Sequence, residues 1–389
     1  MLLFSLLAAA ALALPAAQPT GTATLAPDAE TRWVPFELTP GNQMRFTMAV
    51  DGRPTVAILD TGVSYSVLSR RFADQAALKV KPGGSATAIG GLVDIGWTDT
   101  TSVTLGGATR RGGGLTVATL PAIATGSAQA VDLLVGRDLT GNYALDIDYA
   151  GRRFRLLPSG RMPYRGFTAP LAISRDRLVY VSELTLGAAR LRPMVVDTGD
   201  GSSVTVSAAG WSTARLTGIR TTTAVSFGLA GAVTSTIGVV PSLALGELVA
   251  RNVEIRIEPA NGFSESIEAA GRIGSGFLQN YRVLLDPTAG RMILSPGPTA
   301  DQRPLRSTSG LLVGVDRDRL RILHVMRSGP AAVAGWKEGE TICTIDGQPI
   351  PRDYGTSALA TWSAGAPGRT VALGLCDGTK RTLTLRDFY

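Results

Sequence analysis

The chain has 389 residues, 44% hydrophobic and 18% charged, so it is long enough for two or three folded domains and too apolar for general disorder. Its formal net charge of +7 comes without any Lys/Arg tract, so we expect no nucleic-acid partner. With one histidine, His324, and two cysteines, Cys343 and Cys376, histidine-dependent nucleophilic sites and common zinc sites are excluded from residues 1–323.

The amino end carries an uncharged apolar run, Leu2 to Leu14, followed by Pro15. This pattern predicts that residues 1–17 are a signal peptide and that the protein is exported to the periplasm or secreted. No basic residue precedes the run, so a retained anchor and a buried amino-terminal helix are the alternatives. No later run reaches about 18 apolar residues, so we expect no membrane span after signal cleavage. Residues 18–32 are expected to be a polar lead-in without structure of its own.

An internal repeat follows in a chain whose 46 glycines and 22 prolines, set between Val/Thr/Leu-rich runs, favour a mostly β fold. An apolar run ends in Asp60-Thr61-Gly62, and a second one ends in Asp197-Thr198-Gly199. Further on, residues 136–158 find seven identical partners at a constant spacing in residues 274–296. We therefore expect two copies of one β module, residues 33–160 and 161–298.

The two Asp-Thr-Gly motifs predict a pair of carboxylates. A single motif of this kind usually marks a turn. Two copies related by a pseudo-twofold axis would instead bring Asp60 and Asp197 together. Carboxylates that close share one proton, so one can act as base and the other as acid on a water molecule, without histidine, metal or cofactor.

The neighbouring residues suit such a pair. Gly62 and Gly199 allow backbone to approach the carboxylates closely. The hydroxyl groups of Thr61 and Thr198 can hydrogen-bond across the interface.

On these motifs the chain resembles the retropepsin-like aspartic proteases, in a bacterial single-chain form. The matching segments are residues 60–64 with 133–136, and 197–202 with 272–274. The resemblance covers about residues 33–298 and implies two tandem β-barrel lobes in a bilobal aspartic-protease fold. The sequence departs from the family at the fourth motif position, where a small residue is usual and Val63 and Asp200 stand here. Asp200, if ionised, should raise the pKa of the pair.

The family also implies flaps, β-hairpins that close over a bound peptide. In the first module the flap candidates are Ile89, Gly90 and Gly91, within an apolar segment with glycine hinges; an ordinary loop is the alternative. In the second module the candidate is residues 225–228.

Residues 299–309 are expected to be a polar linker. The unit that follows, residues 310–389, resembles PDZ domains, particularly those of bacterial envelope proteases, through residues 328–335 and 339–347. This implies that protein carboxyl termini bind along a strand, with their carboxylate held by a glycine-rich loop. The loop candidates are Gly310, Leu311, Leu312, Val313 and Gly314; a plain strand start is the alternative.

Cys343 and Cys376 fall on strands that are neighbours in PDZ-like sheets, so they could pair in an oxidising compartment. Two buried free thiols are the alternative. His324 is expected to be an ordinary strand residue rather than a ligand or catalyst.

These expectations combine into an exported aspartic endopeptidase that hydrolyses peptide bonds with water activated by Asp60 and Asp197. The PDZ-like unit would select or tether protein ends, and one chain would suffice as a monomer because it carries both aspartates. Two alternatives remain. One is a peptide-binding protein without hydrolysis, which Asp200 favours; the other is a purely structural β scaffold.

Overall fold

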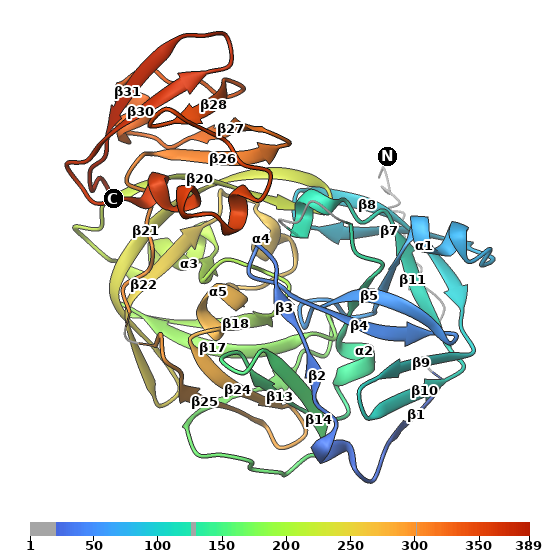
Figure 1. The fold of residues 1–389 in the computed structure, drawn as a ribbon. Helices are drawn as coiled ribbons and strands as arrows, with labels where there is room; N and C mark the ends of the chain where they lie inside the picture. Colours follow the sequence, from blue (N-terminus) through green and yellow to red (C-terminus); the bar gives the residue numbers. More distant parts are fainter. Residues whose placement is uncertain (1–20, 126–129, 301) are drawn as a thin grey trace, which may run out of the picture.

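The computed structural model describes residues 21–125, 130–300 and 302–389, so the expected signal peptide, residues 1–17, lies outside the described residues. Strand accounts for 48% and helix for 12%, which confirms the prediction of a mostly β chain. The strands of the described ranges form four sheets (Figure 1). No helix within these ranges is long and apolar enough to cross a membrane.

The first sheet is built from residues of the first repeat module and the segment before it. Its order is β1-β10-β9-β4-β5-β12-β6-β11-β8-β7, with β3 paired to β4. Alternate residues of β4 are buried, as expected for a strand with one face on a core. The strands are β1 (Thr22–Leu25), β3 (Glu37–Leu38), β4 (Met44–Val50), β5 (Arg53–Leu59), β6 (Val67–Ser69), β7 (Lys81–Ala88), β8 (Gly91–Asp99), β9 (Ser102–Leu105), β10 (Ala108–Arg111), β11 (Gly114–Ala118) and β12 (Leu133–Val135).

The lead-in to this sheet corrects the expectation that residues 18–32 lack structure. Strand β1 pairs antiparallel with β10, and a 3-10 helix, η1 (Ala29–Thr31), follows it. Ala29 is buried, and its Cβ would lie 2.8 Å from a Cβ placed at Gly107. A short polar strand becomes ordered here because the open edge of β10 supplies its hydrogen-bond partners, a long-range pairing that local composition does not reveal.

The second sheet repeats this arrangement in the second module. Its order is β16-β17-β18-β23-β19-β22-β21-β20, so β18-β23-β19-β22 corresponds to β5-β12-β6-β11. Leu134 lies opposite Ile58 in the parallel pair β12–β5, and Arg272 lies opposite Val195 in the parallel pair β23–β18. The strands are β16 (Ala172–Ile173), β17 (Tyr180–Leu186), β18 (Ala189–Asp197), β19 (Val204–Val206), β20 (Thr221–Gly228), β21 (Gly231–Leu245), β22 (Leu248–Ile257) and β23 (Gly271–Gly274).

A third sheet joins the two modules. Its order is β15-β25-β24-β13-β14-β2, and β13 of the first module pairs with β24 of the second. Buried Asp146 lies in this sheet and accepts hydrogen bonds from Arg155 and Arg282, so an ion pair also crosses between modules. One large core cluster contains residues of both modules. The strands are β2 (Val34–Pro35), β13 (Ala144–Asp148), β14 (Arg153–Leu157), β15 (Phe167–Pro170), β24 (Tyr281–Asp286) and β25 (Arg291–Pro296).

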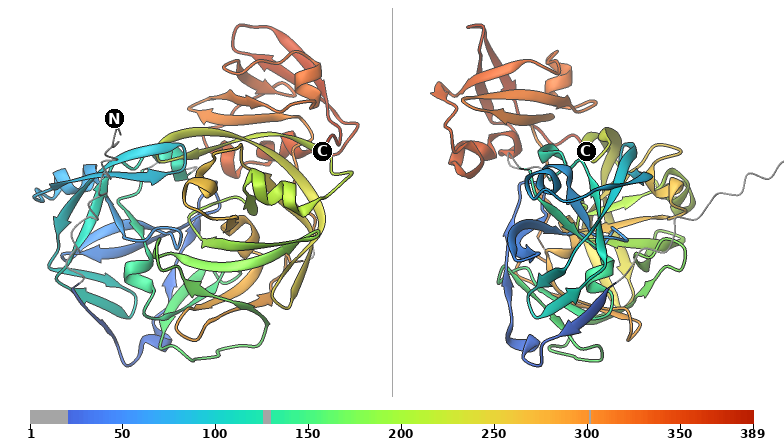
Figure 2. Two further views of the ribbon diagram at one scale, coloured as in Figure 1. Left: turned by 180° about the vertical axis from the view of Figure 1, so that it is seen from behind. Right: turned by 90° about the vertical axis from the view of Figure 1, so that its right-hand side faces the viewer.

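The fourth sheet belongs to the carboxyl-terminal unit, which has its own core around Trp362 and Ile342. Its order is β26-β27-β28-β30-β31, with β29 paired to β28, so β26 is an edge strand. The unit sits on β20 of the second module (Figures 1 and 2). The strands are β26 (Leu311–Asp316), β27 (Arg319–Val325), β28 (Thr341–Ile345), β29 (Gln348–Pro349), β30 (Thr370–Leu375) and β31 (Lys380–Thr384).

The expected linker, residues 299–309, is partly built into the carboxyl-terminal unit, and its residue 301 lies outside the described residues. Thr308 and Ser309 are buried, and both amide groups donate to Ser363 O. The packing of this unit therefore begins before Gly310.

The helices are short and also follow the repeat. Ser69 Oγ accepts a hydrogen bond from Phe72 N at the start of α1, and Ser207 Oγ accepts one from Gly210 N at the start of α3. Each serine caps the helix after the strand that follows an Asp-Thr-Gly motif. The helices are α1 (Arg70–Gln75), α2 (Arg137–Thr140), α3 (Ala208–Ala214), α4 (Phe263–Ser266), α5 (Ser275–Leu278) and α6 (Pro330–Val333), with the further 3-10 helices η2 (Ala122–Thr125), η3 (Tyr354–Thr356) and η4 (Ala358–Ala364).

Candidate active site

The two Asp-Thr-Gly motifs meet where the modules face each other. Asp60 directly follows β5, and Asp197 is the last residue of β18. The residues before them, Leu59 and Val196, are fully buried. Each aspartate is therefore carried by a strand that is fixed in the core of its own module.

Thr61 and Thr198 lock the two motif loops together. Thr61 Oγ1 donates to Val196 O at 2.6 Å, and Thr198 Oγ1 donates to Leu59 O at 2.7 Å. Each hydroxyl group also accepts from the backbone amide of the other threonine, at 3.1 and 3.0 Å. These four bonds obey the pseudo-twofold relation of the repeat, and both threonine side chains are buried, so the relative position of the aspartates is fixed.

The carboxyl groups of Asp60 and Asp197 are hydrogen-bonded to each other. A Cβ atom at Gly62 would lie 2.5 Å from Asp197 Cγ, and one at Gly199 would lie 2.5 Å from Asp60 Oδ1. No side chain fits at either glycine, because each carboxylate packs directly on the backbone of the opposite motif. The four residues that the sequence assigned to support the loops, Thr61, Gly62, Thr198 and Gly199, thus all touch the opposite module.

Burial and mutual repulsion favour the protonated forms of this pair. Burial, followed by the charge of Asp197, raises the pKa of Asp60 well above its usual range. Burial, followed by the charge of Asp200, raises the pKa of Asp197 to about 6. Two carboxyl groups in contact titrate as one coupled unit, so near neutral pH the pair can hold one proton and one negative charge.

A second charged cluster lies beneath Asp197. Arg272 lies on β23 and is buried. Its Nε lies 2.8 Å from Asp200 Oδ2 and 3.8 Å from Asp197 Oδ2. Its Nη1 lies 2.7 Å from Glu258 Oε1. Although burial alone would raise it, Arg272 and Ser202 lower the pKa of Asp200 to about 2. Asp200 is therefore ionised and does raise the pKa of Asp197, as expected, but Arg272 opposes its effect.

Sequence reasoning missed Arg272 and Glu258 as parts of this site. The repeat contains a signal that could have found Arg272, because Leu134 occupies the equivalent position in the first module. It also missed Asn42 and Gln43, whose side-chain amides donate to Gly201 O and Gly199 O at 3.0 and 2.7 Å. Polar residues in a turn gave no hint of this contact between modules.

The flap candidates Ile89, Gly90 and Gly91 lie at the tip of the hairpin β7–β8. In the second module the tip of β20–β21 is Leu229–Ala230, so the candidate segment 225–228 belongs to strand β20 rather than to the turn. The two tips touch, since Ala230 N donates to Ile89 O at 3.2 Å. Leu229 packs on an apolar cluster of the first module that includes Val67, Leu120 and Leu134.

In the carboxyl-terminal unit, Leu311, Leu312, Val313 and Gly314 lie on β26, directly after Gly310. The amide groups of Gly310 and Leu311 donate to Ser307 Oγ and Ser309 Oγ, at 3.0 and 3.1 Å. In this conformation both amides are therefore already hydrogen-bonded to side chains of the same chain. The free edge of β26 remains available for pairing with an added strand.

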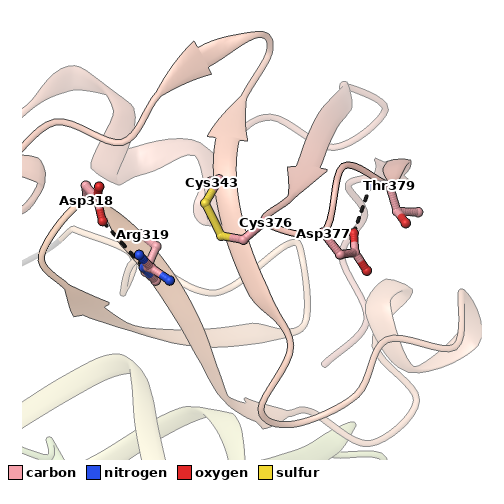
Figure 3. The surroundings of a disulfide bond; sticks show 6 residues. All are labelled: Asp318, Arg319, Cys343, Cys376, Asp377 and Thr379. Carbon is pink, nitrogen blue, oxygen red and sulfur yellow. Dashed lines mark hydrogen bonds and ion pairs between the residues drawn. A yellow bond between two sulfur atoms is a disulfide. The ribbon is translucent and has the colours of Figure 1, made fainter.

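Cys343 on β28 and Cys376, just after β30, are joined by a disulfide (Figure 3). The two strands are antiparallel neighbours, which places the sulfur atoms together. His324 is a buried residue of β27 whose Nε2 lies 2.8 Å from Thr223 Oγ1 and whose Nδ1 lies 2.8 Å from Glu338 Oε1. Its ring thus connects the carboxyl-terminal unit to strand β20.

Among the described residues, no group of three His, Cys, Asp or Glu side chains is arranged to hold a metal ion. A surface cavity of about 430 Å³ lies on the first module, next to Arg71, Phe72 and Asp132, and does not include either aspartate. Asp197 is only 7% exposed, whereas Asp60 is half-buried.

In a comparison with protein families, residues 46–139 match the model of a family described as aspartyl protease. This stretch includes Asp60 and strand β12 and ends before Asp197. The match supports an aspartyl protease of the pepsin or retropepsin type, hence a hydrolase that cleaves peptide bonds. A comparison with curated proteins found no match.

Proposed function

We propose that the chain is an exported aspartic endopeptidase in which the Asp60/Asp197 pair activates a water molecule. The observation that carries this proposal is the hydrogen-bonded carboxyl pair fixed by the reciprocal bonds of Thr61 and Thr198. Two buried, adjacent carboxylates repel each other, and they are retained at functional sites because their pKa values can be separated. A purely structural scaffold would gain nothing from this cost.

In the proposed reaction, the ionised carboxylate takes a proton from water, the water oxygen bonds to the peptide carbonyl carbon, and the protonated carboxyl group donates its proton to the carbonyl oxygen. In the resulting tetrahedral intermediate, the first carboxyl group passes its proton to the amide nitrogen and the C–N bond breaks, so the amine leaves. The second carboxylate recovers a proton from a hydroxyl group of the intermediate as the new carboxylic acid forms. The peptide would lie extended between the two modules. Because the tips of the two hairpins touch above the pair, at Ile89 and Ala230, the hairpins must open to admit it.

The carboxyl-terminal unit is proposed to be a PDZ domain that binds protein carboxyl termini. The free edge of β26 supports this role, because an extended peptide can pair with such an edge by β-augmentation. Carboxylate capture at Gly310 and Leu311 would require their amides to leave Ser307 and Ser309. Export to the periplasm or beyond is proposed from residues 1–17, and the monomer from the presence of both aspartates in one chain.

The test is cleavage of a mixed peptide library by the wild type and by Asp60→Asn and Asp197→Asn variants, with new termini read by mass spectrometry. Either substitution keeps the side-chain shape and should abolish cleavage. Asp74→Asn is the matched control, since Asp74 is an exposed residue of α1. A pepstatin-like inhibitor should block the wild type. Equal cleavage by wild type and Asp60→Asn would refute the dyad mechanism.

The second candidate is a peptide-binding protein that does not hydrolyse. The ionised Asp200, close to the pair, favours it because an added negative charge opposes ionisation of Asp197. Binding of library peptides without new termini, unchanged in Asp60→Asn, would support this alternative.

A further inference from the structure

The charged cluster beneath Asp197 makes the two halves of the site unequal. Ile58 and Val195 stand two residues before the aspartates and occupy equivalent register positions. The strand residue opposite Ile58 is Leu134, whereas the one opposite Val195 is Arg272. A buried guanidinium group therefore lies on the Asp197 side, where the Asp60 side has an aliphatic residue.

Asp197 also accepts more hydrogen bonds from backbone amides than Asp60 does. Asp197 Oδ1 accepts from the amides of Gly199 and Asp200, both at 3.0 Å. The corresponding oxygen of Asp60 accepts from the amide of Gly62 at 3.1 Å, and the amide of Val63 donates to Asp60 O rather than to the carboxylate. Each amide that donates to a carboxylate stabilises its charged form.

The charges that face the pair come from several elements. Asp200 follows β18, Arg272 lies on β23, and Glu258 follows β22. Asp200 is held by Ser202, whose amide and hydroxyl both donate to Oδ1, and by Arg272, which donates to Oδ2. Glu258 accepts from Arg272 and from Ser264 N.

In the first module, the charged residues that follow strand β12 have partners other than Asp60. Arg137 Nε donates to Leu178 O, and Asp138 is occupied by Ser66 and Arg110. The guanidinium group of Arg137 thus faces a backbone carbonyl group, whereas that of Arg272 faces carboxylates.

We propose that Arg272 is a positioning residue that keeps the single negative charge of the pair on Asp197 and leaves the shared proton on Asp60. It acts by balancing Asp200, which would otherwise repel a charge on Asp197, and by its own attraction across 3.8 Å. Asp197 is then the base that takes a proton from water, and Asp60 is the acid. Burial raises the pKa of both carboxyl groups, and Arg272 opposes that rise for Asp197. The role in catalysis rests on the proposed function; the position of the proton does not.

Two substitutions with opposite expected effects test the assignment. Arg272→Met removes the cation and leaves Asp200 unbalanced, so the acid limb of kcat/KM, which reports ionisation of Asp197, should move to higher pH by about one to three units. Asp200→Ser leaves Arg272 free to attract Asp197, so the same limb should move to lower pH. Arg272→Lys retains the charge and should restore a limb close to that of the wild type. A merely structural role would lower activity without moving the limb in opposite directions.

A second readout does not depend on activity. Carbon-13 labelling of aspartate carboxyl groups, with signals assigned through Asp60→Asn and Asp197→Asn, reports which carboxyl group is protonated near neutral pH. We expect Asp60 protonated and Asp197 ionised. If Arg272→Met does not fold, the triple variant Arg272→Leu/Asp200→Val/Glu258→Ala introduces the first-module residues Leu134, Val63 and Ala118 at all three positions. In that variant the difference in protonation between Asp60 and Asp197 should shrink.

The outcomes separate this inference from the proposed function. If the wild type hydrolyses peptides through Asp60 but neither Arg272→Met nor Asp200→Ser moves the acid limb, the inference is wrong and the function stands. If no hydrolysis occurs but the labelled signals shift as expected, the function is wrong and the inference stands. A proton found on Asp197 in the wild type, or an unchanged difference in the triple variant, overturns the inference.

Discussion

Thr61 and Thr198 exchange hydrogen bonds across the contact between the two modules, each donating to the carbonyl group that precedes the other's aspartate. Residues 137 positions apart in the chain thus form one rigid unit beneath the carboxyl pair. The stability of the contact and the geometry of the pair therefore depend on the same two hydroxyl groups.

Replacing Thr198 by valine should destabilise the fold and lower activity together. Valine keeps the shape but leaves Leu59 O and the amide of Thr61 without their buried partner, so the free energy of unfolding should fall by about 1–3 kcal/mol. Urea denaturation measures this loss. Thr198→Ser keeps the hydroxyl group and serves as the control. An unfolding midpoint equal to that of the wild type would contradict the interpretation.

The aspartate pair should make stability depend on pH. Burial raises the pKa of Asp197 in the folded state to about 6, so the folded chain binds a proton more tightly than the unfolded chain. This stabilisation is complete below about pH 4 and is lost as pH rises through about 6. Asp197→Asn never ionises, so relative to the wild type it should gain about 1–3 kcal/mol at pH 7.5 and little at pH 4. Urea titrations at both pH values test this, with Asp74→Asn as control; an equal gain at both would contradict it.

The contact between the hairpin tips should be sensitive to Gly228. A Cβ atom at this position would overlap the backbone of Ile89, so Gly228→Ala should push the tips apart. We expect faster amide exchange in residues 86–92 and 226–232, because the contact that holds the two tips together is weakened. Ser226→Ala, on the same strand, is the control. Unchanged exchange at both tips would show that the contact does not hold the hairpins closed.

The disulfide should stabilise the carboxyl-terminal unit selectively. It closes a loop between residues 33 positions apart within one separate core. Reduction should cost this unit about 2–4 kcal/mol by relaxing the unfolded chain. Calorimetry with and without dithiothreitol should show a lowered transition for this unit, and Cys343→Ala/Cys376→Ala should reproduce the loss. If dithiothreitol does not change the transition temperature of this unit, the disulfide does not stabilise it.

The sequence predicts the parts of this structure that repeat. Asp60 and Asp197 could be paired because the same motif and the same downstream identities occur twice, and pseudo-symmetry then makes the motifs face each other. The partners of Thr61 and Thr198 followed from the same argument.

The features that break the repeat could not be predicted in this way. Strand β1 depends on the open edge of β10, and the contacts of Gln43 depend on how two modules pack. The repeat aligns Arg272 with apolar Leu134, but its ion pairs with Asp200 and Glu258 depend on how strand β23 packs in the second module. Such partners are set by tertiary packing, which local patterns do not contain.

The carboxyl-terminal unit contacts the hairpin β20–β21, whose tip touches the tip of β7–β8, and a simple tether would not make this contact. Thr223 on β20 bonds to His324 Nε2 and accepts from Arg327 N, and Thr222 Oγ1 donates to Arg327 O. Apolar side chains complete the contact, with Ile237 of β21 packed against Met326 and Tyr389. In the same structure, the β20–β21 hairpin packs on the carboxyl-terminal unit and its tip touches the tip of β7–β8. We therefore expect packing on this unit to favour the arrangement in which the two tips touch.

Thr223→Val should therefore speed the hydrolysis of a short peptide. The substitution removes the bonds to His324 and Arg327 N while keeping the shape of the side chain, so the hairpin opens at lower cost. If opening limits turnover, losing about 1 kcal/mol of docking raises kcat/KM about fivefold. The peptide must be too short to reach β26, so that tethering contributes nothing.

His324→Ala should act in the same direction, and Val333→Ser, at an exposed position of α6, should leave the rate unchanged. An unchanged rate in both docking variants would mean that the carboxyl-terminal unit serves only to bind protein ends, and a lower rate would mean that docking supports the active arrangement rather than restraining it.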